Sequence, residues 1–112
     1  MKRVVILRHG KAEQNTMAMD DYDRALTERG INNATAMGTF ILGKTGRPDL
    51  ILSSSAKRAH QTALLAAKGL DYPTGEIEVD RNLYFAPARW ILNAVSKLPD
   101  KIDSCLYVGH NP

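Results

Sequence analysis

Two arginines and two histidines stand close behind short apolar runs in this sequence. Arg8 and His9 follow the first run directly. Arg58 follows a second run after a short serine-rich segment, and His110 comes two residues after a third. Such runs are typical of buried strands, and the carboxyl ends of parallel strands meet at the edge of the sheet where ligands bind. We therefore expect these four side chains to converge.

The chemistry that these residue types support is phosphoryl transfer. Guanidinium groups stay charged and match phosphate oxygens with paired donors, so Arg8 and Arg58 beside a helix N-terminus would bind a phosphoryl group. A neutral imidazole nitrogen in such a site can attack phosphorus and hold the group covalently, which splits one difficult hydrolysis into two easier steps. A second histidine can donate a hydrogen bond to a phosphoryl oxygen.

The expected elements alternate between strands and helices. Strands are predicted over 4–7, 50–52 and 105–108, with a weaker one around 77–79. Helices are predicted from a Thr27 cap to Gly43, after a Ser54 or Ser55 cap, and over 88–98 after Pro87. This alternation implies right-handed crossovers, a mainly parallel sheet and an α/β fold with helices on both faces.

Composition limits the class of protein. With 112 residues the chain allows one domain, residues 1–112, and 44% hydrophobic with 24% charged residues is ordinary for a globular protein. A net charge of +3 is too small and scattered to indicate nucleic acid, but suits small anionic partners. Cys105 is interpreted as a buried structural thiol. No run is long enough for a membrane span or a signal peptide, so we expect a cytoplasmic protein without a membrane partner.

Four segments, in order along the chain, resemble the motifs of the histidine phosphatase superfamily, which includes the phosphoglycerate mutases. They are the RHG signature in 7–12 (LRHGKA), the acidic and L-T-x-x-G segment in 23–30 (DRALTERG), the S-S-x-x-x-R-A-x-x-T-A segment in 53–63 and the second-histidine motif in 108–112 (VGHNP). RHG alone would recur by chance, whereas four ordered matches are specific. The short chain, Lys11-Ala12 and Leu83-Tyr84-Phe85 resemble the SixA-type phosphohistidine phosphatase branch.

The resemblance implies a three-layer α/β/α fold and a role for each matching residue. His9 would be the nucleophile that becomes phosphohistidine. Three further residues would bind the phosphoryl group and stabilise its charge in the transition state: Arg8, Arg58 and His110. Ser53 and Asn111 are candidates for the rim of the pocket. No cofactor and no metal ion are implied.

The sequence departs from the family pattern in two places. Many relatives carry a glutamate general acid near Asp80, and no carboxylate falls at the matching place here, so Asp20 or Asp21 in the long acidic connection could donate the proton instead. A phosphoramidate leaves more readily than an alkoxide, which reduces the need for a strong acid. Relatives normally continue past the second histidine with a helix and usually a strand, whereas this sequence stops at Pro112. We therefore expect a truncated or fragmentary form that associates or binds its ligand weakly.

Ordinary structural interpretations compete with some of these roles. His60 follows Arg58 by two helical positions and points away from it, so a solvent-facing or packing role is favoured. Trp90 is interpreted as core, while Tyr84 and Phe85 could be core or pocket wall. No spacing typical of a zinc site is present, and Lys57-Arg58 lacks the aromatic interleaving of a nucleic-acid site.

The sequence thus predicts a metal-independent phosphatase that acts through His9 on phosphohistidine in a phosphorylated protein, or on a small phosphorylated substrate, and releases phosphate. Two alternatives remain open. One is phosphomonoester hydrolysis or phosphoglycerate mutation within the same superfamily. The other is an inactive module that binds phosphate or a phosphoprotein.

Overall fold

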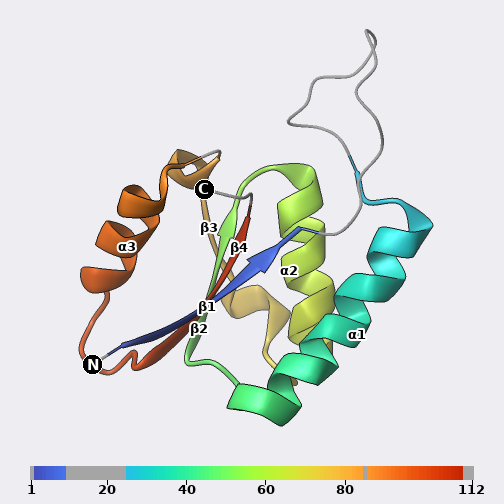
Figure 1. Ribbon diagram of the computed structural model, residues 1–112, viewed down its shortest axis with the longest axis horizontal. Helices are drawn as coiled ribbons and strands as arrows, with labels where there is room; N and C mark the ends of the chain where they lie inside the picture. Colours follow the sequence, from blue (N-terminus) through green and yellow to red (C-terminus); the bar gives the residue numbers. More distant parts are fainter. Residues whose placement is uncertain (1, 10–24, 85, 110–112) are drawn as a thin grey trace, which may run out of the picture.

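The computed structural model describes residues 2–9, 25–84 and 86–109, and its centre is a parallel sheet (Figure 1). The strands are β1 (Arg3–Arg8), β2 (Leu50–Ser54), β3 (Glu78–Asp80) and β4 (Ser104–Gly109). They lie in the order β1-β4-β2-β3, and every pairing is parallel. The four predicted strands are therefore confirmed, each within two residues of its expected ends.

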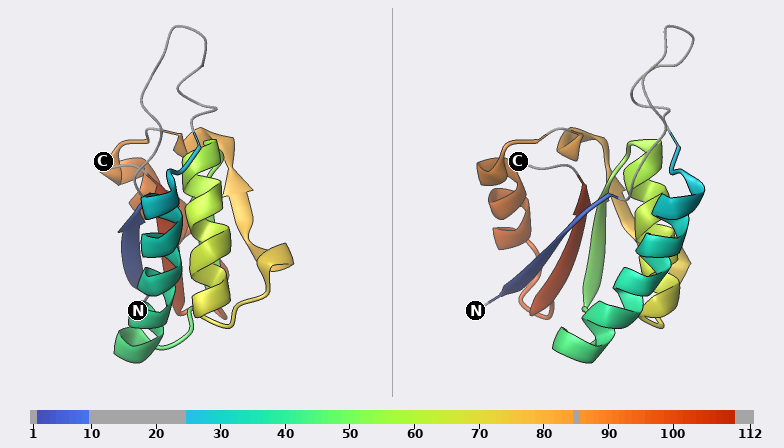
Figure 2. Two further views of the ribbon diagram at one scale, coloured as in Figure 1. Left: turned by 90° about the vertical axis from the view of Figure 1, so that its right-hand side faces the viewer. Right: turned by 45° about the vertical axis from the view of Figure 1, so that its right-hand side comes forward.

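Helices cover both faces of this sheet and complete three layers. Helices α1 (Glu28–Thr45) and α2 (Lys57–Gly69) lie on one face, and α3 (Ala88–Ser96) lies on the other (Figure 2). Two short 3-10 turns, η2 (Thr74–Glu76) and η3 (Arg81–Leu83), flank β3. The α/β class and the layered architecture expected from the sequence are confirmed. No helix within the described ranges is long and apolar enough to cross a bilayer.

Strand register brings the functional motifs to one edge. Arg8 at the end of β1 pairs with Gly109 at the end of β4. On the other side of β4, Ser53 of β2 pairs with Val108. The carboxyl ends of β1, β4 and β2 are thus level, which is the arrangement that a ligand site at a sheet edge requires.

Helix α1 begins as predicted and ends two residues later than expected. The Thr27 side chain caps it by accepting a hydrogen bond from the Gly30 amide at 3.1 Å. The helix continues past Gly43 to Thr45 and ends at Gly46, whose φ of 80° lies in the left-handed region that glycine tolerates. Gly43 therefore does not end the helix, because the backbone takes up a positive φ only at Gly46.

Helix α2 starts differently from the prediction. Its N-cap is Ala56, without a capping side chain, so the expected Ser54 or Ser55 cap is wrong. The Ser54 hydroxyl instead accepts a hydrogen bond from the Ala56 amide at 3.3 Å, which fixes the turn before the helix. The alanine face expected for this helix is buried, as predicted: Ala59, Thr62, Ala63, Ala66 and Ala67.

Helix α3 corrects one assignment of the core. Ile91 and Val95 are buried against the sheet, but Trp90 is 52% exposed and is not a core residue. The helix is short and ends at Ser96, and only its Ile91–Val95 face is turned inward. The flank that carries Trp90 therefore remains in contact with solvent.

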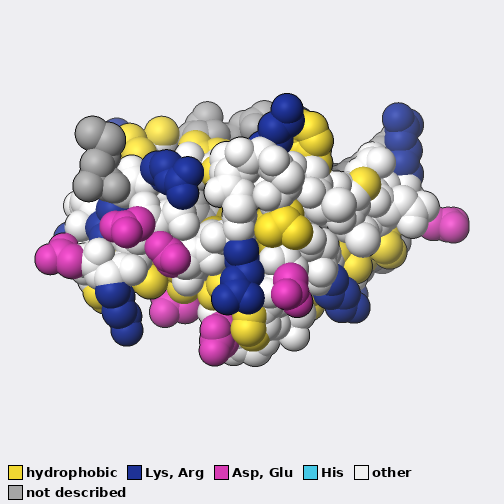
Figure 3. Space-filling view, turned by 90° about the horizontal axis from the view of Figure 1, so that it is seen from below, with side chains coloured by type: hydrophobic (Ala, Val, Ile, Leu, Met, Phe, Trp, Pro, Cys, Tyr) yellow, Lys and Arg dark blue, Asp and Glu magenta, His cyan; other side chains and the backbone are white. Residues whose placement is uncertain are grey.

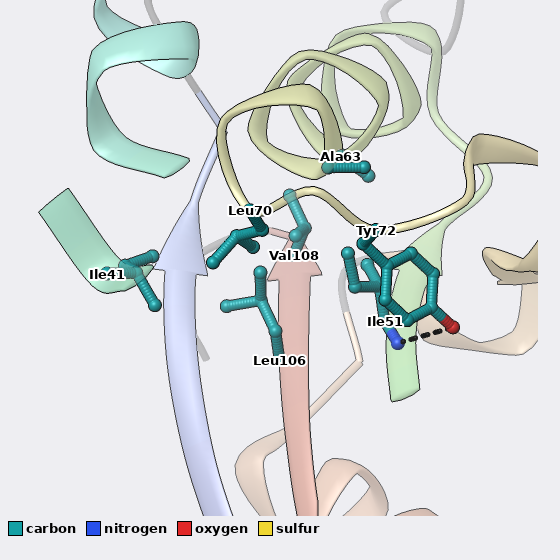
Figure 4. Close-up of a cluster of buried hydrophobic side chains, with 8 residues drawn as sticks. Ile41, Ile51, Ala63, Leu70, Tyr72, Leu106 and Val108 are labelled. Carbon is teal, nitrogen blue, oxygen red and sulfur yellow. Dashed lines mark hydrogen bonds between the residues drawn. The ribbon is translucent and has the colours of Figure 1, made fainter. Parts of the chain in front are cut away.

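Two hydrophobic clusters hold the layers together. The cluster on the α1 and α2 face includes Ile41, Ile51, Leu70 and Leu106, and the Tyr72 hydroxyl accepts a hydrogen bond from the Ile51 amide there (Figure 4). The cluster on the α3 face includes Leu52, Leu83, Ile91, Cys105 and Tyr107. Residues of β2 and β4 alternate between the two clusters, as strand geometry requires.

The end of the molecule where the strands begin carries basic and acidic side chains in mixture. Lysine and arginine alternate there with aspartate and glutamate in the view of Figure 3. Charges of opposite sign in mixture attenuate each other's field at a distance, so this face does not resemble the basic stripe of a nucleic-acid site.

Candidate active site

His9 lies directly beyond β1, and its backbone continues the parallel ladder. Its amide donates to the carbonyl of Gly109 at 2.9 Å, so the main chain of His9 is bonded to the end of β4. Alternation along the strand sets the direction of its side chain. Val5 and Leu7 pack against the cluster on the α1 and α2 face, and His9, two residues after Leu7, is turned to the same face.

Arg58 meets His9 from helix α2. It is the second residue of this helix and is only 1% exposed, a rare environment for a guanidinium. Its Nε donates a hydrogen bond to the Nε2 atom of His9 at 3.3 Å. An imidazole nitrogen that accepts a hydrogen bond carries a lone pair, so the ring proton of neutral His9 is assigned to Nδ1. The site thus combines a buried cation with an imidazole lone pair.

Hydrogen bonds around Arg58 fix the start of α2. The Thr62 hydroxyl, buried one turn along, donates to the Arg58 carbonyl at 2.8 Å. Gln61 accepts a hydrogen bond from the Leu26 amide at 2.8 Å, which ties the entry to α1 onto the same helix. These contacts hold the guanidinium on a rigid element, as a positioned anion ligand requires.

Three serines lie before Arg58, at the end of β2 and in the turn into helix α2. Ser53 is fully buried at the end of β2, and its hydroxyl donates to the Ser54 carbonyl at 2.7 Å. Ser55 differs, because its buried Oγ has no hydrogen-bond partner in the described part of the chain. Ser53 therefore lies at the expected edge, with its hydroxyl engaged by the backbone.

The other predicted site residues divide into two groups. Arg8 is exposed at the end of β1 and lines a small cavity with Asn33 of helix α1 and Thr62 of helix α2. It shares the carboxyl edge of the sheet with His9 and Arg58. Asp20, Asp21, His110 and Asn111 lie outside the described residues.

Cys105 is a second potential nucleophile in the described part of the chain. Burial raises the pKa of the Cys105 thiol to about 11, so this cysteine is protonated at neutral pH and is no nucleophile. It lies on the α3 face, in the structural position predicted for it. Within residues 2–9, 25–84 and 86–109, no three His, Cys, Asp or Glu side chains gather in a way that could hold a metal ion.

Sequence reasoning missed three residues that support this edge. Gln61 and Thr62 lie inside the motif that contains Arg58, yet only the structure reveals their backbone partners. Tyr107 was assigned only to a strand, although its hydroxyl reaches the edge of the sheet and donates to the Leu83 carbonyl at 3.4 Å. The glycine two residues later was the available signal, because it leaves space on the same face of the strand.

Comparison with known proteins agrees with this geometry. The profile of the histidine phosphatase superfamily (branch 1) matches residues 4–84. An uncharacterized protein of Mycobacterium tuberculosis is 33% identical over 106 residues, which make up 95% of this chain and 63% of that protein. The chain therefore spans less than two thirds of the length of this relative.

Solved structures share the fold over nearly the whole chain. The proposed phosphohistidine phosphatase SixA from Agrobacterium tumefaciens has a TM-score of 0.85 and 32% identity, covering 99% of this chain and 70% of its own. The protein histidine phosphatase SixA in complex with tungstate has a TM-score of 0.82 and 26% identity, covering 97% of this chain and 69% of its own. The chain belongs to the histidine phosphatase superfamily, in its SixA-type branch.

Proposed function

We propose that this protein is a metal-independent phosphatase that removes the phosphoryl group from phosphohistidine through a covalent intermediate on His9. The observation that carries the proposal is the contact between His9 and Arg58. The ring nitrogen that carries the lone pair faces a buried guanidinium, and a phosphoryl group would be both bound and attacked there.

The reaction would proceed in two displacements. The lone pair on Nε2 of His9 attacks phosphorus in line while the bond from phosphorus to the leaving imidazole nitrogen breaks and that nitrogen takes a proton. Water then attacks the phosphorus of phosphorylated His9, the bond to Nε2 breaks, and inorganic phosphate leaves. Arg58 stabilises the charge on the phosphoryl oxygens in both steps, which supplies without a metal ion the stabilisation that phosphoryl transfer requires.

Other motif residues would complete this cycle. Arg8 and His110 are proposed as further ligands of the phosphoryl oxygens, with Ser53 and Asn111 at the rim. Asp20 or Asp21 is proposed as the donor of the proton to the leaving group. Because the nitrogen of a phosphoramidate can be protonated before the bond breaks, a weak or distant donor would suffice.

The proposed substrate class rests on the similarity to SixA-type phosphatases and on the ease with which the nitrogen of a phosphoramidate leaves. A histidine-phosphorylated protein in phosphotransfer signalling is proposed as the partner, and a small phosphoramidate as the minimal substrate. A SixA protein forms a complex with tungstate. Because tungstate resembles phosphate in shape and charge, this complex supports an oxyanion as the ligand. The cytoplasmic location expected from the sequence stays a prediction.

A substrate panel tests the proposal and separates its alternatives. The protein and a His9→Ala variant are incubated with phosphoramidate, with a histidine-phosphorylated peptide and with aryl and sugar phosphate monoesters, each with and without a chelator. We expect chelator-resistant loss of the two nitrogen-linked phosphates that His9→Ala abolishes. Preference for the monoesters would favour a phosphomonoesterase. Phosphate binding without turnover would favour a binding module.

A further inference from the structure

Tyr107 belongs to the core by its ring and to the active-site edge by its hydroxyl. The ring lies in the cluster on the α3 face with Leu83 and Ile91, and the residue is only 1% exposed. The side chain extends along β4 toward its carboxyl end, where the hydroxyl donates to the Leu83 carbonyl at 3.4 Å. This hydrogen bond is long, so close packing around the oxygen is the stronger restraint.

The partner in this packing is Gly109. A Cβ placed on Gly109 would collide with the Tyr107 Oη and the ring carbon that carries it. The hydroxyl therefore occupies the space that a side chain of residue 109 would fill. The φ angle of Gly109 is one that other residues can adopt, so the backbone conformation does not require glycine at this position. The close approach of the Tyr107 hydroxyl does.

Gly109 connects this packing to the nucleophile. Its carbonyl accepts the hydrogen bond from the His9 amide at 2.9 Å, on the strand edge that faces β1. A continuous path of contacts thus runs from the Leu83 carbonyl through the Tyr107 hydroxyl and the main chain of Gly109 to the main chain of His9. The path arrives from the α3 face, whereas Arg58 reaches His9 from the α2 face.

We infer that Tyr107 is a positioning residue that holds the end of β4, and through it His9, in the orientation needed for attack. The inference rests on the proposed function of His9. Tyr107→Phe deletes one oxygen, leaves a void against Gly109 and allows the end of β4 to shift, while the helix that carries Arg58 keeps its own contacts. A small displacement of a nucleophile can cost up to about a hundredfold in rate, so we expect kcat to fall by about tenfold. Inhibition by inorganic phosphate should change by less than about twofold, because Arg58 remains in place.

The chain offers a matched control in Tyr72. This tyrosine is 7% exposed, and its hydroxyl also bonds to backbone groups: it donates to the Glu76 carbonyl at 3.1 Å and accepts from the Ile51 amide at 3.4 Å. Tyr72→Phe therefore deletes a comparable buried oxygen from the other face of the sheet, away from Gly109. We expect it to lower stability while leaving kcat for phosphoramidate unchanged.

A readout independent of activity separates this inference from the proposed function. Hydrogen exchange of the His9 amide, followed by NMR, reports the bond to the Gly109 carbonyl directly. We expect Tyr107→Phe to speed this exchange by about tenfold relative to Tyr72→Phe, whether or not the wild-type protein turns over substrate. Equal exchange of His9 in the two variants would overturn the inference. With an active wild type, equal kcat values in the two variants would overturn it as well.

Discussion

Arg58 donates from Nε to the Nε2 atom of His9 across 3.3 Å, and this single contact defines the site. The donor fixes which ring nitrogen faces the cationic end of the pocket. A phosphoryl group bound to the guanidinium would lie against Nε2 and not against Nδ1. In the proposed reaction, this contact makes Nε2 the attacking atom and Arg58 the residue that stabilises the charge on the phosphoryl group.

The planar guanidinium of Arg58 should matter more than its charge. Arg58→Lys keeps a cation but loses the paired donors that match phosphate oxygens. We expect the inhibition constant for inorganic phosphate to rise about tenfold or more, since a charge-assisted hydrogen bond contributes about 1.5–3 kcal/mol. Lys57→Ala is the matched control, because Lys57 is an exposed cation in the same helical turn. A comparable rise of this inhibition constant in both variants would contradict the prediction, because it would show that phosphate binding depends only on positive charge.

The sequence predicts which edge of the sheet carries the site, because the ends of the strands can be located from the apolar runs. The apolar runs that end at Arg8 and before Ser53 fix where the strands stop, and a parallel sheet brings such ends together. The depth of Arg58 could not be predicted in this way. The second position of a helix is compatible with exposure, and Arg58 is buried by tertiary packing that includes its contact with His9.

Two glycines of helix α1, Gly38 and Gly43, should respond to alanine in opposite directions. A Cβ on Gly38 would collide with the Ala66 carbonyl of α2, whereas one on Gly43 has open space around it. Gly38→Ala should therefore lower the free energy of unfolding by about 1–3 kcal/mol, as overpacking does. Gly43→Ala should raise it by about 0.5–1 kcal/mol, because alanine loses less backbone entropy in a helix. Urea denaturation measures both, and destabilisation by Gly43→Ala would contradict this packing.

The Asp49 carboxylate should stabilise the fold only when it is ionised. It accepts hydrogen bonds from the Asp103 and Ser104 amides at 2.8 and 3.1 Å, and these bonds, with a smaller effect of Arg3, hold its pKa below 3.8. A carboxyl whose pKa is lower in the folded than in the unfolded chain adds stability above its ordinary pKa. That contribution is lost as the pH falls through the lowered value.

Asp49→Asn tests this linkage. The stability of the variant should fall less than that of the wild type between neutral pH and acid, and a carbon NMR titration of wild-type Asp49 should give a midpoint under 3.8. Asp100→Asn is the control, because no backbone amide in the described part of the chain donates a hydrogen bond to the Asp100 side chain. A midpoint at or above the ordinary value would contradict the hydrogen bonds to Asp103 and Ser104.

Where sequence reasoning was wrong, local propensity gave way to tertiary packing. A helical stripe containing Trp90 favours burial, but α3 turns only Ile91 and Val95 inward, and the tryptophan stays exposed. Serine before a helix favours an N-cap. Here the Ser54 hydroxyl accepts a hydrogen bond from the Ala56 amide in the preceding turn, and Ala56 is the N-cap residue. The strand pattern alone could not predict where the Tyr107 hydroxyl lies, because the hydroxyl occupies space that is open only when residue 109 is glycine.

The most direct test of the central claim is to trap and identify the phosphorylated histidine. The protein is mixed with phosphoramidate, quenched in alkali, under which phosphohistidine survives, and digested for phosphorus NMR and mass spectrometry. We predict one modified residue, His9, phosphorylated on Nε2, and no modification in His9→Ala. Phosphate on Nδ1, on another residue, or turnover with full rate in His9→Ala would contradict the account.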